Sequence, residues 1–180
     1  MSNQLTAQLL DGRLISLRRL TADDTEAALA LNQHLTDHDR YFRFFTLNPI
    51  DLDQLVGKMT EPAHGRYALG AFDADRLIGV AHYTVLCEDP KVAEIGILVA
   101  HEDHSLGVGT ALVKQLALVA RANGIGRFAA DILGENHLML MMLFDLGWTC
   151  KPIDYGSVRH LEIELPDLLT EVSTATGEVP

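Results

Sequence analysis

A strand, a glycine loop and a helix follow one another within residues 94–121, and this order is the strongest constraint on the fold. Residues 94–99 form a short apolar run rich in β-branched side chains, as in a buried strand. Residues 104–109 carry two glycines, and residues 110–121 repeat apolar side chains at helical spacing. Because the first turn of a helix offers unpaired N–H groups and partial positive charge, this unit predicts an anion site.

The two glycines of the loop, Gly107 and Gly109, narrow the choice of anion. Neither has a Cβ, so a phosphate group can approach the backbone closely. A Walker loop would need a lysine directly after Gly109, and a dinucleotide fingerprint would need a third glycine where Leu112 stands. What remains is a tight Gly-x-Gly after a strand, a pattern that also fits an ordinary turn before a helix.

The six residues His104-Ser105-Leu106-Gly107-Val108-Gly109 resemble the acyl-CoA loop of the GNAT superfamily of N-acetyltransferases, Gln/Arg-x-x-Gly-x-Gly/Ala, with His104 in the first position. In that family the loop amides hold the pyrophosphate of acetyl-CoA. The strand before the loop splays from its neighbour, and its free backbone groups hold the pantetheine arm. The resemblance therefore implies that acetyl-CoA is the co-substrate. The contacts that it implies are Ile97, Leu98, Val99, Ser105, Leu106, Gly107, Val108, Gly109, Thr110 and Asn136. For Asn136, a helix cap is an equally supported role.

The order of predicted elements is similar to the whole GNAT fold over about residues 13–165. Strands are predicted at 13–20, 66–72, 77–87, 94–99, 128–133, 148–153 and 158–165, and helices at 21–36, 48–59, 110–121 and 135–146. Strand, two helices, three strands, helix, strand, helix and two strands make an α/β fold, of the mixed-sheet α+β kind. We expect one domain over residues 1–180, with a loose C-terminal tail at 166–180.

Composition limits the function classes. Hydrophobic residues make up 48% of the 180 residues and charged residues 22%, as in ordinary globular chains, and no apolar run approaches the ~20 residues that span a bilayer. The N-terminus has no secretory pattern and the two cysteines form no disulfide framework, so we expect a cytoplasmic protein without membrane contact. The net charge of −11 disfavours nucleic acid and suits a cationic amine substrate, although solubility alone explains it equally well.

Glu94 is the predicted general base. A lysine amine is mostly protonated at neutral pH, and acetyl transfer needs the neutral amine, so a carboxylate must accept its proton directly or through water. Glu94 begins an otherwise apolar strand, and partial burial there would suit it to proton transfer. The alternative is a glutamate at the strand edge that faces water.

Further segments resemble one subgroup of the family, the bacterial protein-lysine acetyltransferases. These are Ala93-Glu94-Ile95-(x)3-Val99, where the subgroup's glutamate is the base, Tyr41-x-Arg43-Phe44-Phe45, and Leu143-Phe144-x-x-Gly147-Trp148. Many acetyltransferases place a general-acid tyrosine four residues before the helix-ending glycine, and this chain has Leu143 there. Protonation by water or by the released ammonium would then suffice, or Tyr83 or Tyr155 would replace the missing acid.

Two further features have two interpretations each, and a third has one. His101 and His104 are spaced as metal ligands could be, but a loop beside a phosphate site explains them without metal, and we expect none. Residues 138–144 are apolar on every face, which indicates a fully buried helix or, alternatively, a homodimer contact. His82 lies in a predicted strand, where we expect a core histidine with a hydrogen-bond partner.

Three functions fit these observations. The first is a protein-lysine N-acetyltransferase that uses acetyl-CoA, and the subgroup motifs favour it. The second is an acetyltransferase for a small amine such as a polyamine, an amino acid or a drug, which the acidic charge suits. The third is a non-catalytic acyl-CoA-binding module, which His104 and Leu143 favour and Glu94 opposes.

Overall fold

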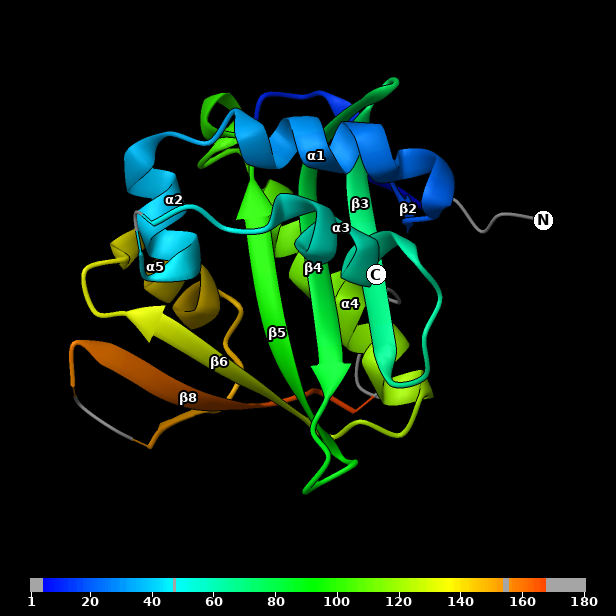
Figure 1. Cartoon of the computed structure of the whole chain (residues 1–180). Coiled ribbons are helices and arrows are strands. Elements are labelled where there is room, and N and C mark those ends of the chain that lie inside the picture. The colour runs from blue at the N-terminus through cyan, green and yellow to red at the C-terminus, as the bar shows by residue number, and fades with distance from the viewer. Residues whose placement is uncertain (1–4, 47, 154–155, 168–180) are drawn as a thin grey trace, which may run out of the picture.

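One eight-stranded sheet forms the centre of the protein, as the computed structural model shows for residues 5–46, 48–153 and 156–167 (Figure 1). The strand order is β1-β2-β3-β4-β5-β6-β8-β7, and only the β5–β6 pair is parallel. The strands are β1 Leu5–Gln8, β2 Leu14–Arg19, β3 Arg66–Asp73, β4 Arg76–Val85, β5 Val92–Val99, β6 Arg127–Leu133, β7 Cys150–Pro152 and β8 Val158–Glu164. This mixed sheet confirms the predicted fold class, including the antiparallel β3–β4–β5 meander.

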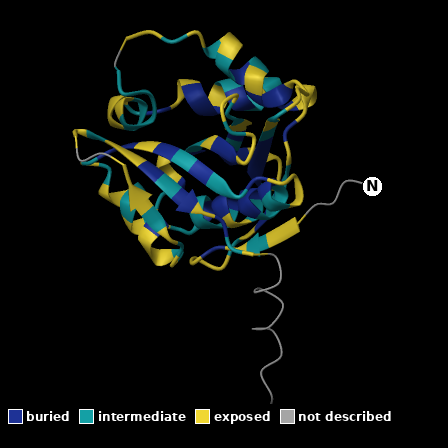
Figure 2. Cartoon of the chain, turned by 90° about the horizontal axis from the view of Figure 1, so that it is seen from below, coloured by how far each residue is buried: buried dark blue, intermediate teal, exposed yellow. Residues whose placement is uncertain are grey.

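Helices cover both faces of the sheet, and Figure 2 shows the buried residues gathered between the layers. The helices are α1 Thr25–Gln33, α2 Asp37–Phe44, α3 Leu52–Thr60, α4 Val108–Ala122 and α5 His137–Asp145, with short 3-10 turns η1 Ala22–Asp24 and η2 His101–Asp103. One core cluster packs α1 and α3 against the sheet, and the other packs α4 and α5 against the opposite face. None of the helices within the described ranges is long and apolar enough to cross a bilayer.

Side-chain caps set where three of these helices begin. Thr36 accepts a hydrogen bond from the amide of Asp39 at 3.1 Å, and Asp51 accepts one from the amide of Gln54 at 2.9 Å. Asn136 caps α5 in the same way, with its Oδ1 3.1 Å from the amide of Met139. These contacts satisfy amides that have no partner inside the helix.

The structure corrects the predicted elements in two places near the N-terminus. Strand β1 extends the sheet beyond the core predicted to begin at residue 13, and its exposed position at the sheet edge explains why its pattern is weak. Two helices were predicted before β3, and there are three, because the Thr36 cap starts α2 as a separate helix. The predicted loose tail lies almost wholly outside the described residues, at 168–180.

The prediction that residues 138–144 form a fully buried helix is wrong. Only Leu143 in α5 is buried, whereas Leu138, Met141 and Phe144 are 47%, 63% and 85% exposed. The helix therefore presents an apolar face to solvent, and the homodimer contact stays a prediction.

Candidate active site

Strands β5 and β6 part from each other directly after Glu94. Their parallel pairing covers Val92 with Arg127, Ala93 with Phe128 and Glu94 with Ala129, and no further pair continues it. On its other edge β5 stays paired with β4 up to Val99. The second half of β5 therefore has one edge without a neighbouring strand, and this opening is the splay that the resemblance implied.

The backbone groups that face this opening follow from strand alternation. The amide of Ala100 donates to the carbonyl of Ile78, which continues the ladder with β4. Because successive residues of a strand turn their amides and carbonyls to opposite edges, Val99, Ile97 and Ile95 turn theirs towards the opening. By the same rule Leu98 bonds to β4 with its backbone, whereas the carbonyl of Ile95, a residue that was not among the site residues predicted from the sequence, faces the opening.

The glycine loop leads into the N-terminus of α4, as predicted, but the helix begins at Val108, two residues earlier than expected. Gly107 is its N-cap with φ +95°, a left-handed conformation that a side chain disfavours, and Ser105 also has a positive φ of 61°. The amide of Ala111 is the first to bond within the helix, to the carbonyl of Gly107 at 3.0 Å. The amides of Val108, Gly109 and Thr110 therefore point out of the helix end as an anion site.

The opening between the strands and the anion site belong to one pocket of about 300 Å³. Nine of the ten residues predicted to bind the co-substrate line it. Leu106 does not line it, and its carbonyl instead accepts a hydrogen bond from the amide of Leu10 at 3.0 Å. Asn136 lines the pocket while capping α5, so the cap role is confirmed and the cofactor role stays a prediction.

Glu94 stands at the vertex of the opening, where the two strands still pair. Its side chain is exposed, so the partial burial that the sequence suggested is wrong. It is absent from the residues that line the pocket, although its neighbours Ile95 and Gly96 line it. The carboxylate is therefore accessible from solvent, one residue from the free edge of β5.

A half-buried arginine lies beside Glu94 on the same side of the sheet. Arg43, from α2, donates from Nη2 to Nε2 of His82 at 2.8 Å and lines the pocket next to Gly96. Burial lowers the pKa of Arg43, and the nearby Glu94 carboxylate opposes this effect. A Cβ on Gly96 would lie 2.5 Å from Nε2 of His82 and 2.7 Å from Nη2 of Arg43, so a larger residue there would displace this hydrogen-bonded pair. The sequence motif around Arg43 gave no sign of this contact.

His82 has the hydrogen-bond partner that we predicted, although it is half-buried and belongs to neither core cluster. Its Nε2 accepts from Arg43, so the ring is neutral, and burial together with the Arg43 charge lowers its pKa to about 3. In the unfolded chain its pKa is about 6.5. The unfolded state therefore takes up a proton that the folded state refuses, and stability falls as the pH drops below about 6.5.

We expect His82→Gln to weaken this pH dependence. Between pH 7 and pH 5 the parent protein should lose about 2 kcal/mol more unfolding free energy than the variant, from the shift between the two pKa values. Urea unfolding at both pH values measures this difference. Equal losses in the two proteins would contradict the neutral state of His82.

Of the two tyrosines that the sequence suggested as a replacement general acid, Tyr83 lies within the described residues, and it does not line the pocket. Leu143 is 3% exposed and lines the pocket with an aliphatic side chain. Tyr83 is 4% exposed and stacks on Tyr67 in the core, away from the pocket lining, and burial raises its pKa. Tyr155 lies outside the described residues.

Comparisons with known proteins agree with this geometry. The model of the Acetyltransferase (GNAT) family matches residues 21–142. Acetyltransferase PA5475 of Pseudomonas aeruginosa is 28% identical over 157 residues, which cover 83% of this chain and 84% of that protein. The solved GNAT domain of S. lividans PAT has a TM-score of 0.81 at 28% identity, and the match covers 90% of this chain and 97% of that domain.

A further solved structure shows the fold together with the co-substrate. It is yncA from Salmonella typhimurium, solved with its cofactor acetyl-CoA, with a TM-score of 0.65 at 17% identity over 83% of this chain and 91% of that one. The match confirms the fold, while the family model covers most of the chain and includes both the glycine loop and Glu94. The splayed strands, the glycine loop and the family match lead to one conclusion: the chain belongs to the GNAT family of acetyltransferases and is an acetyl-CoA-dependent N-acyltransferase.

Proposed function

We propose that the protein acetylates lysine side chains of other proteins and that Glu94 is the general base. The observation that supports this proposal best is the exposed carboxylate of Glu94 at the vertex of the β5–β6 opening. A lysine side chain is long, and the protein that carries it cannot enter a narrow pocket. A base that is accessible from solvent suits such an acceptor better than an enclosed one.

Each part of the site would have a separate role in the reaction. Acetyl-CoA supplies an activated acetyl group, which the neutral amine attacks with release of the CoA thiolate. Backbone groups that face the opening, namely the carbonyl of Ile95, both groups of Ile97 and the amide of Val99, would hold the pantetheine arm, and the amides from Val108 to Thr110 would hold the pyrophosphate. Glu94 would accept one proton from the incoming ammonium. The proton that the nitrogen loses after its attack would reach the thiolate through water, since Leu143 cannot donate one.

A small amine is the second candidate acceptor. The net charge of −11 favours any cationic substrate, whether a free polyamine or a lysine on a protein. The segments around Arg43 and Glu94 resemble protein-lysine acetyltransferases and support the protein acceptor, and the match to 97% of the GNAT domain of S. lividans PAT agrees with it. Membership of an acetyltransferase family weighs against the non-catalytic module.

The test follows thiol release from acetyl-CoA with two sets of acceptors. One set contains lysine-bearing proteins and peptides, and the other contains spermidine, free amino acids and aminoglycosides. We expect turnover with the first set, and mass spectrometry of the acceptors should show acetylated lysine. Turnover with small amines alone would reject the protein acceptor while leaving the acetyltransferase activity intact.

Replacement of the cap glycine should remove co-substrate binding. In Gly107→Val a β-branched side chain must adopt φ +95°, which strains the loop and moves its amides. Acetyl-CoA should raise the melting temperature of the parent protein by mass action, and this rise should be lost in the variant. Gly124→Val is the control, because Gly124 also has a positive φ of 82° but lies outside the pocket. An undiminished rise in Gly107→Val would reject the loop as the pyrophosphate site.

A further inference from the structure

Three metal-ligand side chains meet at the edge of the pocket. Asp39 comes from α2, and His101 and His104 come from η2 and the residue that follows it. One ligand atom from each lies within 4.8 Å of the others, and all three residues line the pocket. The expectation of no metal rested on the two histidines, because the sequence gives no sign that Asp39 joins them.

Hydrogen bonds decide which atoms of the cluster are free to bind a cation. Nε2 of His104 lies 2.9 Å from the carbonyl oxygen of Val99. A carbonyl only accepts, so this nitrogen carries the proton and Nδ1 carries the lone pair. A metal-binding histidine commonly has its second nitrogen fixed on a backbone carbonyl in this way. This hydrogen bond leaves Nδ1 of His104 as the nitrogen that can bind a metal ion.

The carboxylate of Asp39 is also oriented by hydrogen bonds. The hydroxyl of Thr36 donates to Oδ2 at 2.7 Å, and Nδ1 of His101 lies 2.9 Å from the same oxygen. The carboxylate of Asp39 thus has an orienting partner in Thr36, and this contact remains when a metal ion replaces the His101 contact.

The 3-10 turn η2, which begins at His101 and directly precedes His104, is held in place by ion pairs of Asp103. Asp103 is 2% exposed, and its two oxygens accept from Arg13 at 2.8 Å and from Arg76 at 3.0 Å. Two ligands about 2.1 Å from one tetrahedral ion lie about 3.4 Å apart, so ligand atoms that stand up to 4.8 Å apart must approach one another by up to about 1.4 Å when the ion binds. The side chain of His101 is 61% exposed and can turn to make this adjustment.

We propose that Asp39, His101 and His104 bind a divalent transition-metal ion of the zinc class. Two imidazoles and one carboxylate suit Zn²⁺, whereas Mg²⁺ and Ca²⁺ prefer all-oxygen sites. With three protein ligands the ion keeps an open position towards the pocket, close to Ser105 and the anion site. The proposal concerns metal binding alone and does not depend on which amine is acetylated.

The experiment titrates Zn²⁺ into the chelator-treated full chain by isothermal calorimetry. We expect one ion per chain. His101→Ala should weaken zinc binding by at least about tenfold, because the loss of a residue that only hydrogen-bonds to a metal ligand already costs about that much. Because His101 is exposed, its replacement should leave the fold intact, which circular dichroism checks. Asp39→Asn and His104→Ala should weaken binding to a similar degree.

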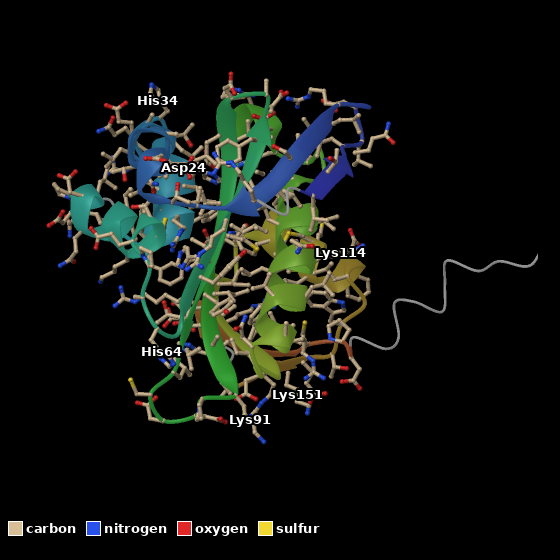
Figure 3. The ribbon with its side chains drawn as sticks, turned by 90° about the vertical axis from the view of Figure 1, so that its right-hand side faces the viewer. Asp24, His34, His64, Lys91, Lys114 and Lys151 are labelled. Atoms are coloured by element: carbon tan, nitrogen blue, oxygen red, sulfur yellow. The ribbon has the colours of Figure 1, made fainter. Side chains whose placement is uncertain are left out.

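Two histidine variants serve as controls. His160 pairs with Asp131 as His101 pairs with Asp39, but the described residues offer that pair no third ligand. His64 lies in the loop before β3 (Figure 3) and does not line the pocket. Neither His160→Ala nor His64→Ala should change zinc affinity. Unchanged affinity in His101→Ala, or an equal loss in His160→Ala, would overturn the proposed site.

Discussion

Glu94→Gln should lower the rate of acetyl transfer by about 10²–10⁴-fold near neutral pH, the usual cost of losing a general base. The variant keeps the shape of the side chain and removes its capacity to accept a proton. The exposed position of Glu94 means that the substitution leaves no cavity, so folding and acetyl-CoA binding should survive. The rate loss should be greatest where the acceptor amine is mostly charged, and part of the rate should return at high pH.

The measurement is turnover against pH at saturating acetyl-CoA, with co-substrate affinity determined separately. Glu88→Gln is the matched control, because Glu88 is also an exposed glutamate and lies outside the pocket lining. It should keep the rate and the pH profile of the parent protein. Parallel profiles for Glu94→Gln and the parent would reject the base assignment, and weakened co-substrate binding would assign Glu94 to the shape of the site instead.

Leu143→Ala should lower the free energy of unfolding by ~2–5 kcal/mol, because it leaves a cavity under α5. Leu143 is 3% exposed and belongs to the core cluster between α4, α5 and the sheet. The chemical step should change less than stability does, since an aliphatic side chain donates no proton. Urea unfolding measures the first effect, and turnover at a temperature where the variant is folded measures the second.

Leu138→Ala on the same helix is the control for this prediction. Leu138 is 47% exposed, so its truncation removes little buried surface and should cost much less stability. A large loss of turnover in Leu143→Ala without a change in unfolding would mean that Leu143 acts in the chemistry. It would also show that the position of the general acid has been misassigned.

Local patterns in the sequence were sufficient to predict most of the fold and the anion site. The glycine loop, its flanking strand and its helix are contiguous in the chain, so spacing and residue type determine their geometry. The same holds for the β3–β4 hairpin and for the cap at Asn136. Errors occurred where a pattern is short, as in β1, or where composition was taken as burial, as in α5.

Contacts between distant segments were decided only by the tertiary structure. Glu94 is exposed although its strand is apolar, because its side chain lies on the face of β5 opposite to that of Ala93, which is buried in the core cluster with α4 and α5. Arg43 contacts His82, and Asp39 meets His101 and His104, only because α2 packs beside the end of β5. A sequence specifies local conformation through nearby residues, whereas such pairings depend on how whole elements pack, and no local spacing encodes them.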